Sequence, residues 1–254
     1  MELVTDSNWS SEAAQVLARA CAHAGGSELW HSLRVVRLVP GRLSGFVPWL
    51  KGVGPSFERA GAFEVEPRLQ RTRFLGYPDP EHDGVYDAGK VRIERRADRK
   101  VVFEAERHRA SFRGLAGYRR WSHLDALYFF GYALCHYHSL PFSLFDARLL
   151  QHRVVRAANS VLDALEVELP KGLHTHCRRQ RFYFAANGQL IRHDYQAEIV
   201  GVWALGAHYW NRQVSCSGLP IALERHVFAR IGGIALPITA LLATFDSAEA
   251  EFAP

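Results

Sequence analysis

One expected β-hairpin, between residues 176 and 199, carries the side chains best suited to chemistry. Its turn is Asn187-Gly188, the strongest short-range hairpin signal, because a type I′ turn needs a positive φ at both central residues. A two-residue loop fixes the register, and alternation along each strand gives one polar and one apolar face. The polar face sets Arg181 opposite Asp194. The apolar face is predicted to point inward and consists of the pairs Phe184–Ile191, Phe182–His193, Gln180–Tyr195 and His176–Ile199.

A few polar groups on an otherwise apolar inner wall are typical of a small-molecule site. A buried imidazole such as that of His193 must satisfy its ring nitrogens, and either a ligand or a neighbouring side chain can do so. A hydrophobic ligand cavity and a histidine that belongs only to the core therefore remain alternatives. If a ligand binds, the hairpin and a central aromatic helix are expected to form its site: Tyr128, Tyr132, His176, Gln180, Phe182, Phe184, Ile191, His193 and Tyr195.

An enzyme acting on the same apolar or aromatic molecule is the main alternative to simple binding. His193 would then act as general acid or base, with Tyr195 and His208 as the other catalytic groups. The sequence contains no phosphate-binding loop, dinucleotide fingerprint, nucleophile elbow or zincin helix. We therefore expect any chemistry to need no cofactor, as in an isomerase or cyclase of secondary metabolism.

Metal binding is not expected, although two histidines have a suggestive spacing. His174-x-His176 puts two imidazoles on the same face of an expected strand. A catalytic zinc site usually has three protein ligands, and no third ligand stands at a convincing distance. The cysteines show no C-x-x-C spacing and are expected to be buried thiols: Cys21, Cys135, Cys177 and Cys216.

The elements that must position these groups begin with an amino-terminal helix. Ser10 and Ser11 can cap it, apolar residues recur at helical spacing, and Gly25-Gly26 ends it. From residue 33 to 109 the pattern changes to short extended runs broken by Gly, Pro and Asp, which indicates antiparallel strands. These strands are expected over residues 35–39, 62–65, 70–75, 90–95 and 100–104.

A second helix, over residues 121–137, is the central element of the predicted fold. Ser122 and Asp125 form a capping box at its start, and Pro141 follows its end. Aromatic and aliphatic residues occur all round it, so it is predicted to be buried on most sides. Strands return from residue 154 to 253. The expected fold class is α+β, a single antiparallel and strongly curled sheet, or incomplete β-barrel, wrapped around this helix in one domain, residues 1–254.

Composition and charge restrict the partners. The chain has 254 residues, is 48% hydrophobic and carries a formal net charge of +5, with arginines concentrated from Arg92 to Arg120. We expect an arginine-rich solvated sheet face, and a protein-interaction module built on these strands is a further alternative. No nucleic-acid-binding signature accompanies the charge. The sequence shows neither a secretory signal nor a run long enough to span a bilayer, so a cytoplasmic protein is expected; its oligomeric state stays open.

Several segments resemble a known fold family. The amino-terminal helix that ends in Gly-Gly before Trp30, and the long strands around an internal helix, resemble LolA-like proteins, the fold of the bacterial lipoprotein carrier. The segments 125–133, 180–184 and 188–195 resemble a set of uncharacterised bacterial proteins of about this length. The resemblance implies an incomplete β-barrel whose concave face holds a lipid or another apolar ligand.

Two departures bear on what the resemblance implies. Lipoprotein carriers act outside the cytoplasm and need an export signal, which is not visible in residues 1–6. The segment from Pro220 to His226 also departs from the Pro-Thr-x-Arg-Arg form expected of the bacterial relatives. Lipoprotein transport itself is therefore not expected, and the leading hypothesis is a cytoplasmic protein that binds a hydrophobic small molecule.

Overall fold

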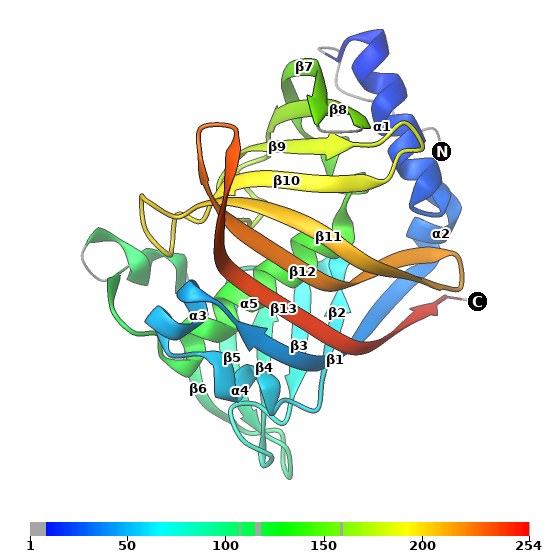
Figure 1. Cartoon of the computed structure of the whole chain (residues 1–254). Coiled ribbons are helices and arrows are strands. Elements are labelled where there is room, and N and C mark those ends of the chain that lie inside the picture. Colours follow the sequence, from blue (N-terminus) through cyan, green and yellow to red (C-terminus); the bar gives the residue numbers. More distant parts are fainter. Residues whose placement is uncertain (1–8, 107, 115–117, 158–159, 254) are drawn as a thin grey trace.

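The computed structural model describes residues 9–106, 108–114, 118–157 and 160–253 (Figure 1). The amino-terminal residues 1–6, in which no export signal is expected, lie outside these ranges. The α-helices are α1 (Ser11–His23), α2 (Gly26–Ser32), α3 (Phe46–Lys51), α4 (Gly54–Glu58) and α5 (His123–Ser139). The strands are β1 (Leu33–Ser44), β2 (Ala62–Glu66), β3 (Arg71–Leu75), β4 (His82–Asp87), β5 (Lys90–Arg95), β6 (Val101–Ala105), β7 (Arg148–Ala157), β8 (Ser160–Glu168), β9 (Arg179–Phe184), β10 (Leu190–Gln196), β11 (Leu205–Cys216), β12 (Leu219–Ile231) and β13 (Ile234–Phe252).

Within the described ranges, thirteen strands form one antiparallel sheet, which confirms the α+β class. The strand order is β6-β5-β4-β3-β2-β1-β13-β12-β11-β10-β9-β8-β7. Strands β1 and β13 are therefore neighbours in the middle, where Val36 pairs with Ala250. Strands β6 and β7, which flank α5 in the sequence, form the two edges of the sheet.

Helix α5 packs against both halves of the sheet (Figure 1). On one side Thr72 of β3 donates its hydroxyl to the carbonyl oxygen of Gly131, at 3.1 Å. On the other side the ring of Tyr137 lies 4.7 Å from that of His208 on β11. The residues from Asp125 to Tyr137 are all buried, which confirms the prediction of an enclosed helix.

The ends of α5 follow the predicted local signals. The Ser122 hydroxyl accepts a hydrogen bond from the Asp125 amide at 3.2 Å, and the Asp125 carboxylate accepts one from the Ser122 amide at 2.8 Å. Both orphan donors of the first turn are satisfied in this way. The helix ends at Ser139, before Pro141.

The turn of the β9–β10 hairpin differs from the predicted one. The amide of Gly188 donates to the carbonyl of Ala185 at 2.9 Å, and the amide of Ala185 donates to the carbonyl of Gln189 at 2.9 Å. The loop therefore has three residues, and of the dipeptide Asn187-Gly188 only the glycine has a positive φ, +87°. The expected type I′ turn is wrong because a three-residue loop needs only one left-handed position, which Gly188 supplies.

A bulge on β10 compensates for the longer turn. Phe184 pairs with Leu190 and Tyr183 with Arg192, so one extra residue, Ile191, stands between the two pairs. The pairs nearest the predicted site, Phe182–His193 and Arg181–Asp194, therefore keep the predicted register. The pair Phe184–Ile191 is wrong. The half-buried Ile191 packs instead with Leu162, Ala164 and Tyr183, on the face of the sheet opposite to Phe182 and Phe184.

Some elements have no counterpart in the predictions. The five strands expected between residues 35 and 104 are present as β1, β2, β3, β5 and β6, but β4 was not expected. Helices α2, α3 and α4 were not expected either, because each has only five to seven residues and lacks a helical period that shows in the sequence. Within the described ranges, no helix is long and apolar enough to cross a membrane.

Candidate ligand-binding site

The predicted polar groups of the hairpin meet α5 in the core of the protein. His176, Gln180 and His193 are each at most 1% exposed. Gln180 occupies the centre, because its carbonyl oxygen accepts hydrogen bonds from His136 Nε2 at 3.1 Å and from His193 Nε2 at 2.5 Å. Its amide nitrogen donates to the Thr175 hydroxyl and to the Cys177 carbonyl, each at 2.6 Å. One amide thus holds two imidazoles.

These contacts fix the protonation of the two imidazoles. A carbonyl oxygen only accepts, so His136 and His193 both carry their proton on Nε2 and leave Nδ1 as a bare acceptor. Burial lowers the pKa of His136 to about 4, and burial together with the neighbouring imidazoles holds the pKa of His193 well below 6.5. Both rings are neutral at physiological pH.

Tyrosines of α5 hold the second pair of histidines. His176 contacts the Tyr132 hydroxyl through Nδ1 at 3.0 Å and the Tyr137 hydroxyl through Nε2 at 2.6 Å. The Tyr128 hydroxyl lies 3.0 Å from Nδ1 of His174. Residues 174–176 form a turn segment and not a strand, so the two imidazoles do not share a strand face as predicted. Each imidazole is held by its own tyrosine contacts, which explains the doublet without a metal.

Ring stacking closes the remaining space in this region. His193 stacks on Phe182 with centroids 4.4 Å apart, and His176 stacks on Tyr195 at 4.1 Å. Phe182 and Phe184 are buried against α1 and the 142–147 segment. The predicted site residues are therefore brought together, except for Ile191, but most of them contact one another. They form a packed wall.

A cavity of about 350 Å³, called here the apolar pocket, opens beside this wall. It lies between α3, the 197–204 turn and strands β11 to β13, and its inner end reaches Phe129 of α5 and Tyr195. Of the predicted ligand-binding residues, Tyr195 is the one that lines it. Its other lining side chains are aliphatic or aromatic: Phe46, Val47, Ala197, Val200, Trp203, Ala204, Leu205, Val227, Ala229, Ile238, Ala240 and Leu241.

Exposed aromatic side chains line the apolar pocket or lie next to it. Phe46 is 45% exposed and Trp203 is 43% exposed, and their rings are 5.8 Å apart. Trp49, one helical turn after Phe46, is 73% exposed. Large apolar groups that converge on a cavity mouth mark binding surfaces more often than scattered ones do. The prediction missed these residues, although aromatic residues beside Gly45, Pro48 and Gly201 in turn-rich segments were a usable signal.

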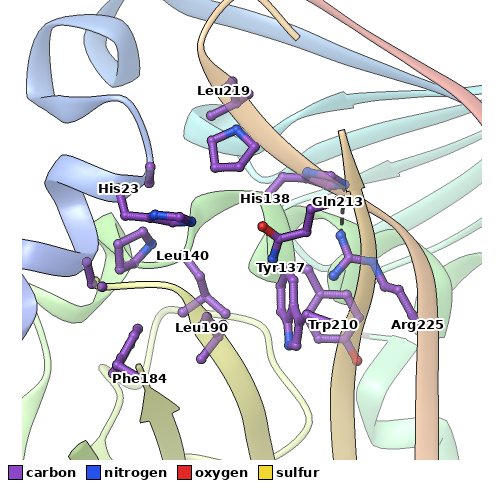
Figure 2. Close-up of a pocket in the computed structure, with 15 residues that line it drawn as sticks. His23, Tyr137, His138, Leu140, Phe184, Leu190, Trp210, Gln213, Leu219 and Arg225 are labelled. Atoms are coloured by element: carbon purple, nitrogen blue, oxygen red, sulfur yellow. Dashed lines mark hydrogen bonds between the residues drawn. The ribbon is translucent and has the colours of Figure 1, made fainter. Parts of the chain in front are cut away.

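Two smaller cavities are related to the apolar pocket by shared lining residues. The inner cavity, about 30 Å³, shares Phe129, Tyr195 and Val227 with the apolar pocket and also touches His208. The arginine cavity, about 60 Å³, shares Tyr137 and Arg225 with the inner cavity (Figure 2). Phe184, another predicted binding residue, lines the arginine cavity. Three cavities thus follow one another along β11 and β12.

His208, predicted as a catalytic group, lies at the inner cavity with both ring nitrogens unpartnered within the described structure. Burial and the charge of Arg225 hold the pKa of His208 well below 6.5. Burial raises the pKa of Tyr195 well above 10. At neutral pH both side chains are therefore uncharged, and an acid or base role would need substrate contacts that lower these barriers to proton transfer.

The arginine-rich segment is largely ion-paired within the chain. Arg92 lies 2.6 Å from Glu94, and Arg99 pairs with both Asp83 and Glu94 at 3.1 Å. Arg109 pairs with Glu198 at 2.6 Å. This arrangement supports the solvated sheet face over a docking site for an anionic macromolecule. In the described part of the chain, no three His, Cys, Asp or Glu side chains are grouped to hold a metal ion.

Comparison with known proteins gives a structural likeness and no sequence family. No protein-family model matches the sequence, and no curated protein is significantly similar to it. A LolA superfamily protein from Nitrosomonas europaea superimposes with a TM-score of 0.48 and 7% identity, over 93% of this chain and 92% of that chain. A DUF1329 family protein from Desulfovibrio piger gives 0.46 and 10%, over 93% and 92%. A lipoprotein-sorting protein domain from Vibrio parahaemolyticus gives 0.45 and 10%, over 93% and 91%. The predicted resemblance to LolA-like proteins is thus confirmed as a structural similarity.

Proposed function

We propose that the protein binds an apolar or aromatic small molecule in the apolar pocket and serves as its carrier. The pocket itself carries this proposal, because about 350 Å³ lined almost wholly by aliphatic and aromatic side chains falls in the size range of small-molecule sites. Burial of about 200 Å² of apolar ligand surface there would contribute roughly 5 kcal/mol before the costs of association. The Tyr195 hydroxyl is a polar contact that could orient the ligand.

We further infer that the sheet bends around α5 as an incomplete barrel. The contacts of α5 with β3 on one side and with β9 and β11 on the other support this arrangement. The helix then occupies most of the concave face, and the apolar pocket is the space left at its amino-terminal half, beside Phe129. This location accounts for the apolar lining, since the pocket walls belong to the main hydrophobic core.

A cavity-filling substitution tests the proposal. Ala240→Trp on β13 places a ring in the apolar pocket, whereas Ala235→Trp on the same strand alters a residue outside its lining. Titration with the fluorescent probe N-phenyl-1-naphthylamine should show saturable binding to the wild type and to Ala235→Trp. Ala240→Trp should bind at least about tenfold more weakly, a change of about 1.4 kcal/mol. No saturable binding to the wild type, or equal binding by Ala240→Trp, contradicts the proposal.

The same titration separates binding from the enzyme hypothesis. His193 is fully buried and is not among the residues that line the apolar pocket. His193→Ala should therefore keep most of the wild-type probe affinity. If a ligand is turned over, and His193→Ala lowers the rate about 100-fold or more while binding persists, the cofactor-independent enzyme becomes the better account.

A further inference from the structure

Arg225 is a buried cation without a counter-charge. It lies on β12 in phase with the inward residues Ile221, Leu223 and Val227, and it is only 3% exposed. Within the described structure, no carboxylate lies near it, and the residues around the arginine cavity include neither Asp nor Glu. Burial lowers the pKa of Arg225 to about 10, which still leaves the group charged at neutral pH. Buried charges in proteins are normally paired.

Two aromatic rings pack against this guanidinium group, but their faces supply no hydrogen-bond acceptor atoms. Its carbon lies 4.1 Å from the ring centre of Trp210 and 5.0 Å from that of Tyr137. The N–H donors lie in the guanidinium plane and need acceptor atoms, which the faces of these two rings do not supply. Nη2 contacts His138 Nε2 at 3.5 Å, but Nε and Nη1 have no acceptor in the described part of the chain. At least three of the five N–H donors, those on Nε and Nη1, are therefore unpartnered within the described residues.

The arginine cavity is lined in part by Arg225 (Figure 2). Its volume of about 60 Å³ is enough for a small group of heavy atoms. Two further residues that line it have buried polar atoms without partners within the described residues: the indole N–H of Trp210 and Nε2 of His23 on α1. The remaining wall includes the apolar Leu140, Phe184 and Leu190 and the polar Gln213. A site that offers cationic and neutral donors but no acceptor carboxylate is built for an anion.

We propose that the arginine cavity binds a carboxylate, held by the free guanidinium N–H groups of Arg225 and by the indole N–H of Trp210. The paired donors of a guanidinium group match the two oxygens of a carboxylate. One cation beside the neutral imidazoles of His138 and His208 balances a monoanion but leaves a phosphate dianion half uncompensated.

The carboxylate has two possible sources, a short free acid or the head of a longer amphipathic molecule. The lining of the inner cavity includes Arg225 and also Phe129, Tyr195 and Val227, which line the apolar pocket as well. An apolar body in that pocket would point its acid group toward Arg225. Only this second source rests on the proposed function.

Isothermal titration of the full chain with propionate, decanoate and decanol tests the site. Decanoate should bind about tenfold or more tightly than decanol, and Arg225→Gln should remove that preference while it leaves decanol binding unchanged. Arg34→Gln, an exposed arginine on β1, makes the same change of net charge and should behave as the wild type. Arg225→Lys, which keeps the charge but not the paired donors, should retain part of the preference.

The outcomes distinguish the two proposals. Arg225-dependent binding of propionate as well as decanoate assigns the site to short acids, and binding of decanoate alone assigns it to amphipathic acids. Equal wild-type affinity for decanoate and decanol, together with no Arg225-dependent binding of propionate, overturns the carboxylate site and leaves the apolar carrier intact. If the wild type does not bind the naphthylamine probe but shows Arg225-dependent binding of propionate, the carrier proposal alone is overturned. The comparison of ligands on the wild type stands even if Arg225→Gln fails to fold.

Discussion

At the scale of single residues, Gly131 sets how closely α5 approaches the sheet. A Cβ atom built on Gly131 would overlap Cβ and Cγ of Tyr86 on β4. The same close approach brings the Gly131 carbonyl within hydrogen-bond distance of Thr72. Glycine usually weakens a helix interior, so its presence in the middle of α5 indicates that this approach outweighs helix propensity.

Gly131→Val should therefore destabilise the protein by about 1–3 kcal/mol through overpacking against Tyr86. Gly172→Val is a matched control, because a Cβ at the exposed Gly172 meets no atom within 4 Å. Urea denaturation of both variants measures the difference in unfolding free energy. Equal stability of Gly131→Val and the wild type would contradict this prediction, since it would show that Tyr86 moves aside without a cost in stability.

The residue scale also explains which part of the site the sequence could predict. Alternation along β10, a local pattern, predicts that His193 and Tyr195 point inward, and both are buried in the structure. The same rule applied to β12 would have found Arg225, since it is in phase with Ile221 and Leu223. The lining of the apolar pocket could not be predicted this way. Phe46, Trp203 and Ile238 belong to three elements that only the complete sheet brings together.

At the scale of elements, the start of α5 depends on a small polar cluster. The Asp125 carboxylate, fully buried, accepts hydrogen bonds from the Ser122 amide and hydroxyl at 2.8 Å each and also contacts Arg119 and His108. These bonds, which outweigh the cost of burial, hold the pKa of Asp125 well below its usual range. The cluster ties the helix to the segment before it.

Ser122→Ala should cost about 1–2 kcal/mol of stability, because it removes the hydroxyl that accepts from the Asp125 amide. Ser10→Ala at the start of α1 removes a cap of the same kind outside this cluster, and a cost of about 1 kcal/mol is expected there. Thermal and urea unfolding of the two variants give both values. A loss at Ser10 larger than at Ser122 would contradict the special role of the cluster.

Elements were predictable where one local signal decides them. The capping box fixed the start of α5, and periodicity located β1, β2, β3, β5 and β6. The hairpin shows the limit of this approach. Asn187-Gly188 marks a turn, but its loop length depends on whether β10 can place Ile191 in a bulge, and that depends on packing against Tyr183. The short helices α2 to α4 are likewise decided by packing.

At the scale of the whole molecule, the buried histidines make stability depend on pH. Burial lowers the pKa of His136 to about 4 and holds those of His176, His193 and His208 well below 6.5. The unfolded chain thus binds protons below pH 6.5 that the folded chain does not. Stability rises with pH wherever the unfolded state binds more protons. The contribution of these histidines to stability is therefore fully present above pH 6.5 and is lost as the pH falls below that value.

The free energy of unfolding should decrease by several kcal/mol between pH 7.5 and pH 4.5, and His136 alone accounts for about 3 kcal/mol down to pH 4. Urea denaturation followed by circular dichroism across this range measures the change. His136→Gln should give a shallower dependence, since one fewer proton is taken up on unfolding. A flat profile would show that these imidazoles are solvated in the folded protein.

The β1–β13 ladder has a consequence for the growing polypeptide on the ribosome. Strand β1 can pair with β2 early in synthesis. Its second partner, β13 (residues 234–252), is synthesised after every other strand of the sheet. Until then, β1 and β12 each present an open row of amide and carbonyl groups, which favours pairing with other chains. A nascent chain that stops before Ile234 therefore holds two sheets that share no ladder and are connected only through α5 and side-chain contacts such as Arg109–Glu198. Premature termination should give aggregation rather than a slightly weakened fold.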